Sequence, residues 1–248
     1  MQALIDRLSR LGDVSQDQID RLQALKPRRR GFVRGAVLRR CDEASTHVFC
    51  IVSGWAIRCR ILPDGQRQIL SIMMPGDVCD LQALVGADHD HHIIALTDLE
   101  VDECPAVRFE ALVAGEAALA QLFLMGKVRE DSLLREQIVR LGRRKARERV
   151  LHLFVEICER QRQNGEARPN RLAHGLNRET LADALGLSPV HVSRSLAALT
   201  RAGVIAVERG CVEIHDLEAA ARLCAYDRAY LHEGGHGLRP ALQKTEQG

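Results

Sequence analysis

The stretch Asn177–Glu213, NRETLADALGLSPVHVSRSLAALTRAGVIAVERGCVE, decides the fold of the surrounding chain. Asn177 is a good N-cap residue, and Gly186 can adopt the left-handed conformation that ends a helix tightly. Ser188 and Pro189 then supply a cap and a first-turn proline for a second helix. Both helices have an apolar face, formed by Leu181 and Leu185 in the first and by Val192, Leu196 and Leu199 in the second. This pattern predicts a helix-turn-helix, whose second helix can enter a major groove of DNA.

A β-hairpin is expected directly after these two helices. Val204–Val207 and Cys211–Ile214 are short apolar runs, and they flank the turn sequence Glu208-Arg209-Gly210. A helix-turn-helix followed by a hairpin is a winged helix. The alternative is an unrelated helical hairpin, which the turn glycine and the Ser-Pro restart disfavour. The sequence therefore predicts a DNA-binding module.

Particular side chains of this module are candidates for contact with DNA. The second helix should project Pro189, Val190, Ser193 and Arg194 outward, with His191 beside them. Arginine pairs well with a guanine edge, so Arg194 is the best candidate for reading a base, and a phosphate contact is its alternative role. For three further residues, a contact with a DNA phosphate and a solvent-exposed position without a partner are equally good interpretations. These residues are Arg178, Thr180 and Arg209.

Composition limits the other possibilities. Aromatic residues make up 3% of the 248 residues, which argues against a protein that binds single strands by base stacking, and the net charge of +2 is too small to indicate nucleic acid by itself. The eight cysteines form no C-x-x-C pair, so neither a zinc site nor an iron–sulfur cluster is expected, and we expect no cofactor. No signal peptide and no long apolar run is evident, which favours a cytoplasmic protein without a membrane span.

The order of patterns along the chain predicts an α+β fold with several parts. Short helices in residues 1–25 precede recurrent short strands from about Phe32 to Val107, which indicate an antiparallel β-roll or jelly roll. We expect a sensor-like β-roll domain at 1–117, a dimerisation helix at 118–142, a winged-helix domain at 143–232 and a disordered tail at 233–248. The last helix is expected to run from a cap at Asp216 to about His232.

The long helix carries two apolar flanks, and a single domain cannot cover both of them. We therefore expect one flank to pack on the β domain and the other on a second copy of the chain. The stripe assigned to this helix is Leu119, Phe123, Leu134, Ile138 and Leu141. A hinge is expected after Gly142, where residues 140–149 carry six basic side chains and one acidic one. A second basic run, residues 26–40, is interpreted as a solvated loop and strand edge, because it lies far from the helix-turn-helix in sequence.

This order resembles the Crp/Fnr family of bacterial transcription regulators over about residues 20–230. The residues that carry the resemblance are Gly54, Pro63-Asp64-Gly65, Pro75-Gly76-Asp77, Ala95–Val101, Leu141-Gly142 and the helix-turn-helix itself. The resemblance implies a cytoplasmic homodimer that binds a two-fold-symmetric DNA site. It also implies that the protein activates or represses transcription through contact with RNA polymerase. Many members of the family have a glutamate where this chain has Val190, which could instead pack on a thymine methyl group.

The sequence departs from the family's cyclic-nucleotide-binding members at the expected effector pocket. Those members carry Gly-Glu and Arg-Ser where this chain has Cys79-Asp80 and His89-Asp90. A histidine between aspartates is a poor substitute for a guanidinium at a phosphate, so we expect a degenerate pocket that does not bind cAMP or cGMP. The effector, if there is one, stays unknown.

Other interpretations of this region remain open. The tract Asp88–His92 could hold a metal or respond to pH, but a polar turn between strands is favoured. Cys79 could be a redox-reactive thiol, although a packed cysteine fits its acidic neighbours better. A haem- or redox-gated regulator of the same fold is the alternative function, with possible haem ligands at His47, at the histidines of 89–92 and at the cysteines. A cupin-like metal enzyme is disfavoured, because the β region offers only His47 outside that tract.

Overall fold

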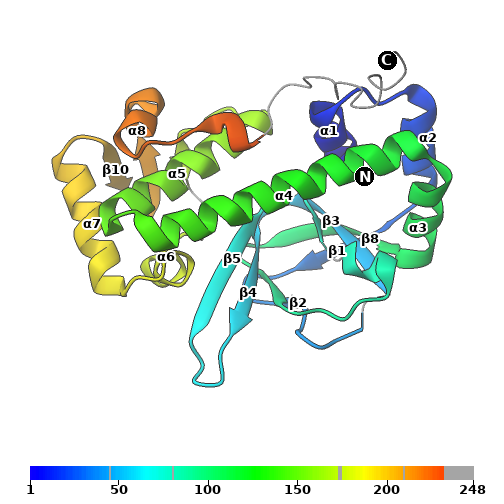
Figure 1. The fold of residues 1–248 in the computed structure, drawn as a ribbon, viewed down its shortest axis with the longest axis horizontal. Coiled ribbons are helices and arrows are strands. Elements are labelled where there is room, and N and C mark those ends of the chain that lie inside the picture. Colours follow the sequence, from blue (N-terminus) through cyan, green and yellow to red (C-terminus); the bar gives the residue numbers. More distant parts are fainter. Residues whose placement is uncertain (45, 80, 173–174, 209, 232–248) are drawn as a thin grey trace, which may run out of the picture.

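The computed structural model describes residues 1–44, 46–79, 81–172, 175–208 and 210–231 (Figure 1). The predicted tail at 233–248 and the predicted site residues Asp80 and Arg209 lie outside these ranges. The N-terminal part contains helices α1 (Gln2–Leu11) and α2 (Gln16–Ala24), followed by a β domain that ends in α3 (Ala106–Gly115). The strands of the β domain are β1 (Arg28–Phe32), β2 (Val37–Arg39), β3 (His47–Ser53), β4 (Ala56–Ile61), β5 (Arg67–Met73), β6 (Val78–Cys79), β7 (His92–Ala95) and β8 (Leu99–Pro105), with a 3-10 turn η1 (Leu81–Val85).

The β domain consists of two antiparallel four-stranded sheets, as the recurrent short strands predict. Their strand orders are β1-β8-β3-β6 and β2-β7-β4-β5. Apolar side chains from both sheets fill the space between them, including Phe49, Ile51, Ile93 and Val101, each exposed by no more than 1%. Gly54 connects β3 to β4 with φ of +78°, and a Cβ atom there would lie 2.1 Å from the carbonyl oxygen of Asp98. The tight turn between the sheets therefore requires glycine.

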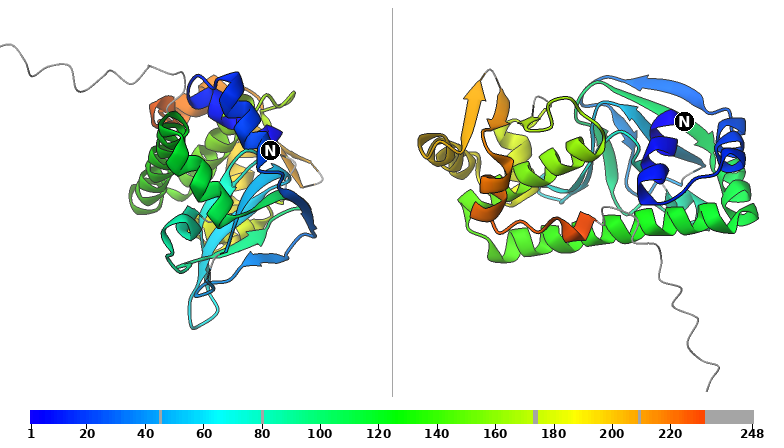
Figure 2. Two further views of the ribbon diagram at one scale, coloured as in Figure 1. Left: turned by 90° about the vertical axis from the view of Figure 1, so that its right-hand side faces the viewer. Right: turned by 90° about the horizontal axis from the view of Figure 1, so that it is seen from above.

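Helix α4 (Ala117–Arg143) runs the length of the molecule (Figure 1), and in the view from above it forms one edge with both domains on the same side (Figure 2). Its first half packs against α1 and α3 through Leu119 and Phe123, which are 0% and 8% exposed. These two residues of the predicted stripe are therefore covered by the chain's own N-terminal helices. Ile138 is 69% exposed, as a partner-facing residue would be, and Leu134 and Leu141 are half-buried.

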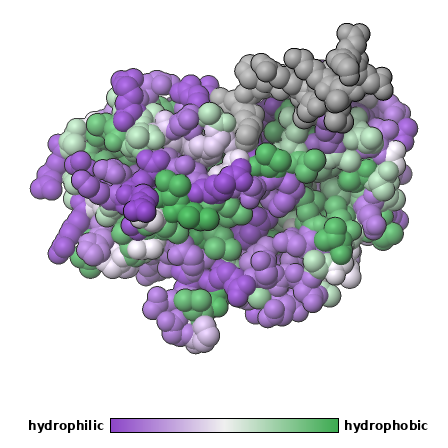
Figure 3. Space-filling model, in the orientation of Figure 1, coloured by the Kyte–Doolittle hydropathy of each residue, from purple (hydrophilic) through white to green (hydrophobic). Residues whose placement is uncertain are grey.

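A different apolar stripe lies free on α4. Leu124, Val128, Ile138 and Val139 are 63%, 46%, 69% and 44% exposed. Figure 3 shows hydrophobic surface along the path of α4 in the same orientation as Figure 1. Large apolar side chains gathered on one helix face usually mark a contact surface.

The C-terminal domain follows a break in the helix at Arg144 and Lys145. It contains α5 (Ala146–Gln163), α6 (Arg178–Leu185), α7 (Pro189–Arg201), α8 (Leu217–Leu223) and a 3-10 turn η2 (Arg228–Leu231). Its sheet has the order β10-β11-β9, with strands β9 (Arg171–Leu172), β10 (Ile205–Glu208) and β11 (Cys211–Ile214). The predicted hairpin is confirmed, and β9 adds a third strand. The last helix ends at Leu223 instead of running to about His232, since Ala225 has φ of +47°, which an α-helix cannot accommodate.

The two domains pack on each other as well as on α4. Trp55 and Leu96 of the β domain belong to the same apolar cluster as the core of the C-terminal domain. Arg67 of β5 also pairs with Asp183 of α6 at 2.8 Å. Within the described residues, no single helix is long and apolar enough to cross a membrane, while α3 and α4 pass that test only as a pair bent by 113°.

Replacing Gly54 with alanine should destabilise the fold by about 3 kcal/mol or more, because the substitution adds both backbone strain and a clash with Asp98. Gly65→Ala is the matched control: Gly65 has a similar φ of +84°, but a Cβ atom added there would meet no atom within 4 Å, so about 1 kcal/mol is expected. Urea unfolding of the three proteins measures both effects. Equal losses in the two variants would contradict the close approach at Gly54.

Candidate nucleic-acid interface

The helix-turn-helix is held by the local interactions that the sequence predicts. The side chain of Asn177 accepts a hydrogen bond from the Thr180 amide at 2.8 Å and caps α6. Gly186 ends α6 in the left-handed conformation, with φ of 59°. The Ser188 side chain accepts from the His191 amide at 3.3 Å, and Pro189 occupies the first turn of α7. These caps fix the angle between the helices, because each satisfies backbone donors that the helix leaves unpaired.

The outer face of α7 presents most of the predicted reading residues to solvent. Pro189, Val190, His191 and Arg194 are exposed. Arg194 forms no hydrogen bond or ion pair with any described residue. Ser193 is half-buried, and its hydroxyl donates to the Pro189 carbonyl oxygen at 2.9 Å. An exposed guanidinium without an internal partner is available for a base edge or a phosphate.

The structure changes the predicted phosphate contacts. Arg178 is exposed at the start of α6 and is available to a phosphate. Thr180 is only 4% exposed, so its side chain is not available. The Thr180 side chain lies on the face of α6 that packs toward the core. Arg209 lies outside the described residues.

A groove of about 990 Å³ runs beside α7. It is lined by the start of α6, by the wing and by one face of α7, which contributes Ser193, Ala197 and Arg201. Arg34, from the turn between β1 and β2, also lines it. Arg34, Arg178 and Arg201 are all exposed and outnumber Glu179, the acidic residue of the lining, so the groove carries net positive charge beside the candidate reading residue.

Two of these lining arginines were missed in the sequence. The signal for Arg201 was present, since residues 193, 197 and 201 are spaced by four and share a helix face. Arg34 belongs to the basic run at 26–40 that was set aside for its distance along the chain, and only the packing of the two domains brings it to the groove. Other members of that run are ion-paired, as Arg29 is with Asp102 at 2.8 Å and Arg30 with Glu103 at 2.9 Å.

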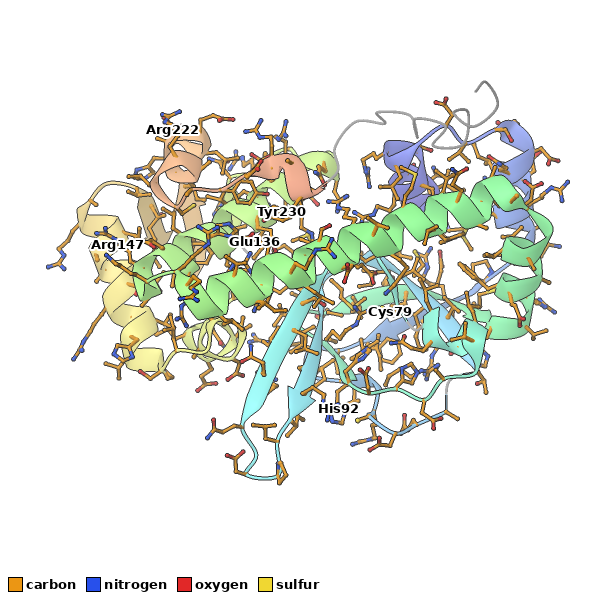
Figure 4. All side chains as sticks on the ribbon, in the orientation of Figure 1. Cys79, His92, Glu136, Arg147, Arg222 and Tyr230 are labelled. Carbon is orange, nitrogen blue, oxygen red and sulfur yellow. The ribbon has the colours of Figure 1, made fainter. Side chains whose placement is uncertain are left out.

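The residues of the predicted effector pocket lie in different environments. Cys79 is completely buried in the core of the β domain (Figure 4), where its thiol lies 3.8 Å from the Met73 sulfur. His89 is 1% exposed, whereas the side chain of Asp90 is 77% exposed. The tract 88–91 forms a loop as predicted, but His89 and His91 are buried with their rings edge to face. Burial lowers the pKa of His91, although the hydrogen bond with Asp90 opposes the shift.

Neither metal ligation nor the reactivity of Cys79 gains support from the geometry. No three His, Cys, Asp or Glu side chains of the described residues converge as a metal site requires. Burial raises the pKa of Cys50 to about 12 and that of Cys59 to about 11. Cys41 and Cys211 are only partly buried.

A buried polar network joins α4 to α5 at the predicted hinge and so sets the position of the DNA-binding helices. Arg140 is 1% exposed and donates to Gln137, to Glu156 and to the Nδ1 atom of His152, the last at 3.1–3.2 Å. Since Nδ1 accepts, the proton of the neutral ring is on Nε2, which lies 3.1 Å from Glu136. The hydroxyl of Tyr230 donates to Glu156 at 2.9 Å.

Comparisons with known proteins agree with this architecture. Residues 29–116 match the cyclic nucleotide-binding domain and residues 148–223 match the Crp-like helix-turn-helix domain. The chain is 30% identical to the transcriptional activator protein FnrL of Cereibacter sphaeroides, over 72% of this chain and 73% of that protein. It is also 30% identical to the nitrogen fixation regulation protein FixK of Rhizobium meliloti, over 80% and 85%. The chain belongs to the Crp/Fnr family of transcription regulators.

A solved structure of another protein has the same fold as this Crp/Fnr regulator. FixK2 from Bradyrhizobium japonicum superposes with a TM-score of 0.71 at 25% identity, covering 79% of this chain and 96% of that one. The predicted family and fold are thus confirmed. The related proteins are transcription regulators and not enzymes, so the cupin-like enzyme is dropped.

The pH dependence of folding should reveal the buried His152. Burial, together with the charges of Arg140 and Arg144, lowers the pKa of His152 to about 2. A histidine in the unfolded chain has a pKa near 6.5, so the folded state loses stability as the pH falls below about 6.5. Between pH 7 and pH 5 this amounts to about 2 kcal/mol. His152→Asn keeps a hydrogen-bond acceptor for Arg140 but cannot be protonated. Between pH 7 and pH 5 the free energy of unfolding of this variant, measured with urea, should therefore fall by about 2 kcal/mol less than that of the unaltered protein.

A His152→Asn protein whose stability falls as steeply as that of the unaltered chain would show that His152 is not held neutral.

Proposed function

We propose that this Crp/Fnr regulator acts as a homodimer on a palindromic DNA site, with α7 of each copy in a major groove. The observation that carries the proposal is Arg194, exposed on α7 without an internal partner and next to a positively charged groove. In this proposal, Arg194 reads a base edge, Val190 packs on a thymine methyl group, and Pro189 and His191 shape the contact. Arg34, Arg178 and Arg201 then contact phosphates, which position the helix without reading sequence.

The dimer in this proposal forms through α4. Its free stripe of Leu124, Val128, Ile138 and Val139 is apolar and lies on the face away from the chain's own domains. An isologous contact between two such stripes would bury both and relate the copies by a two-fold axis. Two recognition helices on a palindrome must lie about 34–36 Å apart, one turn of DNA. The proposal assigns residues 1–117 to sensing, 118–142 to dimerisation and 143–232 to DNA binding.

We further infer that the regulator works in the cytoplasm through contact with RNA polymerase and does not respond to cyclic nucleotides. Support for the last point comes from the pocket region. Cys79 stands where cyclic-nucleotide-binding members have a glycine, and His89 stands where they have the arginine that pairs with the phosphate; both side chains are buried. Neither group supplies the fixed positive charge that a phosphate needs.

Replacing Arg194 should change sequence preference as well as affinity. Selection of binding sequences from a random DNA pool first defines the site. Arg194→Ala should then bind it about 10- to 100-fold more weakly and lose preference at one base pair per half-site, since a bidentate arginine–guanine pair contributes about 1–3 kcal/mol. Arg201→Ala is the control and should weaken all sequences alike. Uniform loss in Arg194→Ala as well would assign Arg194 to a phosphate.

Placing a charge in the α4 stripe should separate the dimer. Ile138→Glu introduces a carboxylate into the proposed contact, where burial without a partner is costly, while the side chain remains solvated in the single chain. We expect a monomer by light scattering at concentrations where the unaltered protein is a dimer, together with loss of tight binding to the palindrome. Val107→Glu is matched, because Val107 on α3 is also 69% exposed. A dimeric Ile138→Glu protein would refute the α4 interface.

A further inference from the structure

Several buried charges meet where α1, the turn before β6, α4 and α5 come together. Asp77 is 8% exposed and pairs with Arg160 of α5 at 2.8 Å and with Arg7 of α1 at 3.2 Å. It also accepts from the Met74 amide at 2.8 Å. Burial opposes ionisation of this carboxyl, but Arg7 and Arg160 outweigh it and lower its pKa. Asp77 is thus a carboxylate already shared by two guanidinium groups.

Two more arginines reach the same junction and find only neutral partners. Arg129 of α4 is 2% exposed and donates to the side-chain oxygen of Gln163. Arg10 of α1 is half-buried and donates to the side-chain oxygen of Asn164 at 3.0 Å. The Nε atoms of both arginines are buried and have no hydrogen-bond partner among the described residues. Buried donors in folded proteins are nearly always satisfied, so these two require an acceptor.

The balance of charges at this junction also indicates that a negatively charged partner is needed. Arg7, Arg10, Arg129 and Arg160, the arginine cluster, carry four positive charges. The buried carboxylate of Asp77 faces them, and the exposed carboxylate of Asp6 acts on Arg10. Glu130 on the neighbouring turn of α4 is occupied by Lys127 at 2.8 Å and Arg58 at 3.7 Å. On α5, Glu159 is paired with Arg162 and Arg228. Burial and then the charges of Arg7 and Arg160 lower the pKa of Arg129 to about 9, and Asp77 opposes this shift only in part. Arginine resists deprotonation, so a counter-ion is the more favourable remedy.

We propose that the arginine cluster binds a small inorganic oxyanion, such as phosphate or sulfate. Guanidinium groups present pairs of N–H donors that match the oxygens of such an ion. A cleft of about 30 Å³ lies beside the cluster, which contributes Arg7 to its lining. Lys127, the carboxylates of Asp77 and Glu130, and several apolar side chains line the rest. The cleft has room for two or three water molecules or one small ion, and it excludes a nucleotide.

An ion at this place would connect three parts of the molecule. Arg7 and Arg10 belong to the N-terminal helix of the sensor part, Arg129 to the dimer helix, and Arg160 to the helix that leads into the DNA-binding domain. By offsetting the excess positive charge that these arginines share, it would stabilise the present arrangement of the domains. This regulatory consequence rests on the proposed function, whereas anion binding itself does not.

Thermal unfolding of the full-length protein tests the site. Gluconate buffer is replaced by phosphate, sulfate or chloride at constant ionic strength and pH. Phosphate and sulfate should raise the unfolding midpoint saturably, by about 5 °C at a hundredfold excess over Kd. Arg129→Gln should abolish this shift. In gluconate, Arg129→Gln should unfold at or above the midpoint of the unaltered protein, because it removes an uncompensated charge.

Two other variants complete the design. Arg135→Gln is the control, since Arg135 lies on the same helix but is exposed and paired with Asp131, and it should respond as the unaltered protein does. Arg10→Gln lies at the half-exposed edge of the cluster and should weaken the shift in unfolding midpoint. This variant tests the site if Arg129→Gln does not fold. An equal shift in all variants, or an equal shift with chloride, would reduce the effect to general salt stabilisation and overturn the proposal.

DNA binding measured in gluconate keeps the two proposals separate. Selective binding there, without any oxyanion effect on unfolding, would refute the anion site and leave the proposed function intact. Oxyanion stabilisation that depends on Arg129, in a protein that selects no DNA sequence, would refute the proposed function alone.

Discussion

The contact of Arg140 with α5 is the interaction on which the placement of the DNA-binding helices depends. Its guanidinium is buried at the end of α4 and bonds to His152 and Glu156. Apolar packing alone would let two helices slide or rotate at small cost, whereas a forked donor with fixed acceptors accepts only one geometry. A misplaced partner would leave a buried charge unsatisfied, which costs several kcal/mol. The break at Arg144 and Lys145 is flexible in principle, but this network holds α5 at one angle.

Helix α5 is anchored a second time near its other end. Arg160 bonds to Asp77 and to the Ile72 carbonyl oxygen at 2.8 Å, so the β domain holds the C-terminal turns of α5 while α4 holds the central turns. Between these anchors the helix carries a continuous apolar face into the C-terminal core, including Val150, Phe154 and Ile157. A shift of the β domain relative to α4 would therefore act on α5 directly. Helices α6 and α7, which pack on α5, would move with it.

The parts of this structure that depend on local chemistry could be predicted from the sequence, and the parts that depend on packing could not. Asn177, Gly186 and Ser188 have backbone preferences that specify the helix-turn-helix without knowledge of the rest of the chain. The two apolar flanks of α4 look alike in sequence, so nothing local showed that α1 and α3 would cover Leu119 and Phe123 and leave Leu124 and Val128 free. Arg34 was likewise assigned to solvent, because its approach to the groove follows from domain docking. The burial of Thr180 and His89 depends on the same long-range contacts.

The segment after α8 explains why the Arg140 network can work at all. A polar network between two helices at the molecular surface would compete with water and hold no fixed geometry. Here the chain turns at Ala225 and lays Tyr226 and Tyr230 against His152, with ring centroids 5.1 and 6.4 Å away. Arg144 secures this cover by donating to the carbonyl oxygen of Cys224 at 2.5 Å. Excluding water strengthens each charged hydrogen bond beneath it and makes any unpaired group there more costly. The orientation of α5 is therefore determined jointly by α4, by α5 itself and by a C-terminal segment some 80 residues away in sequence.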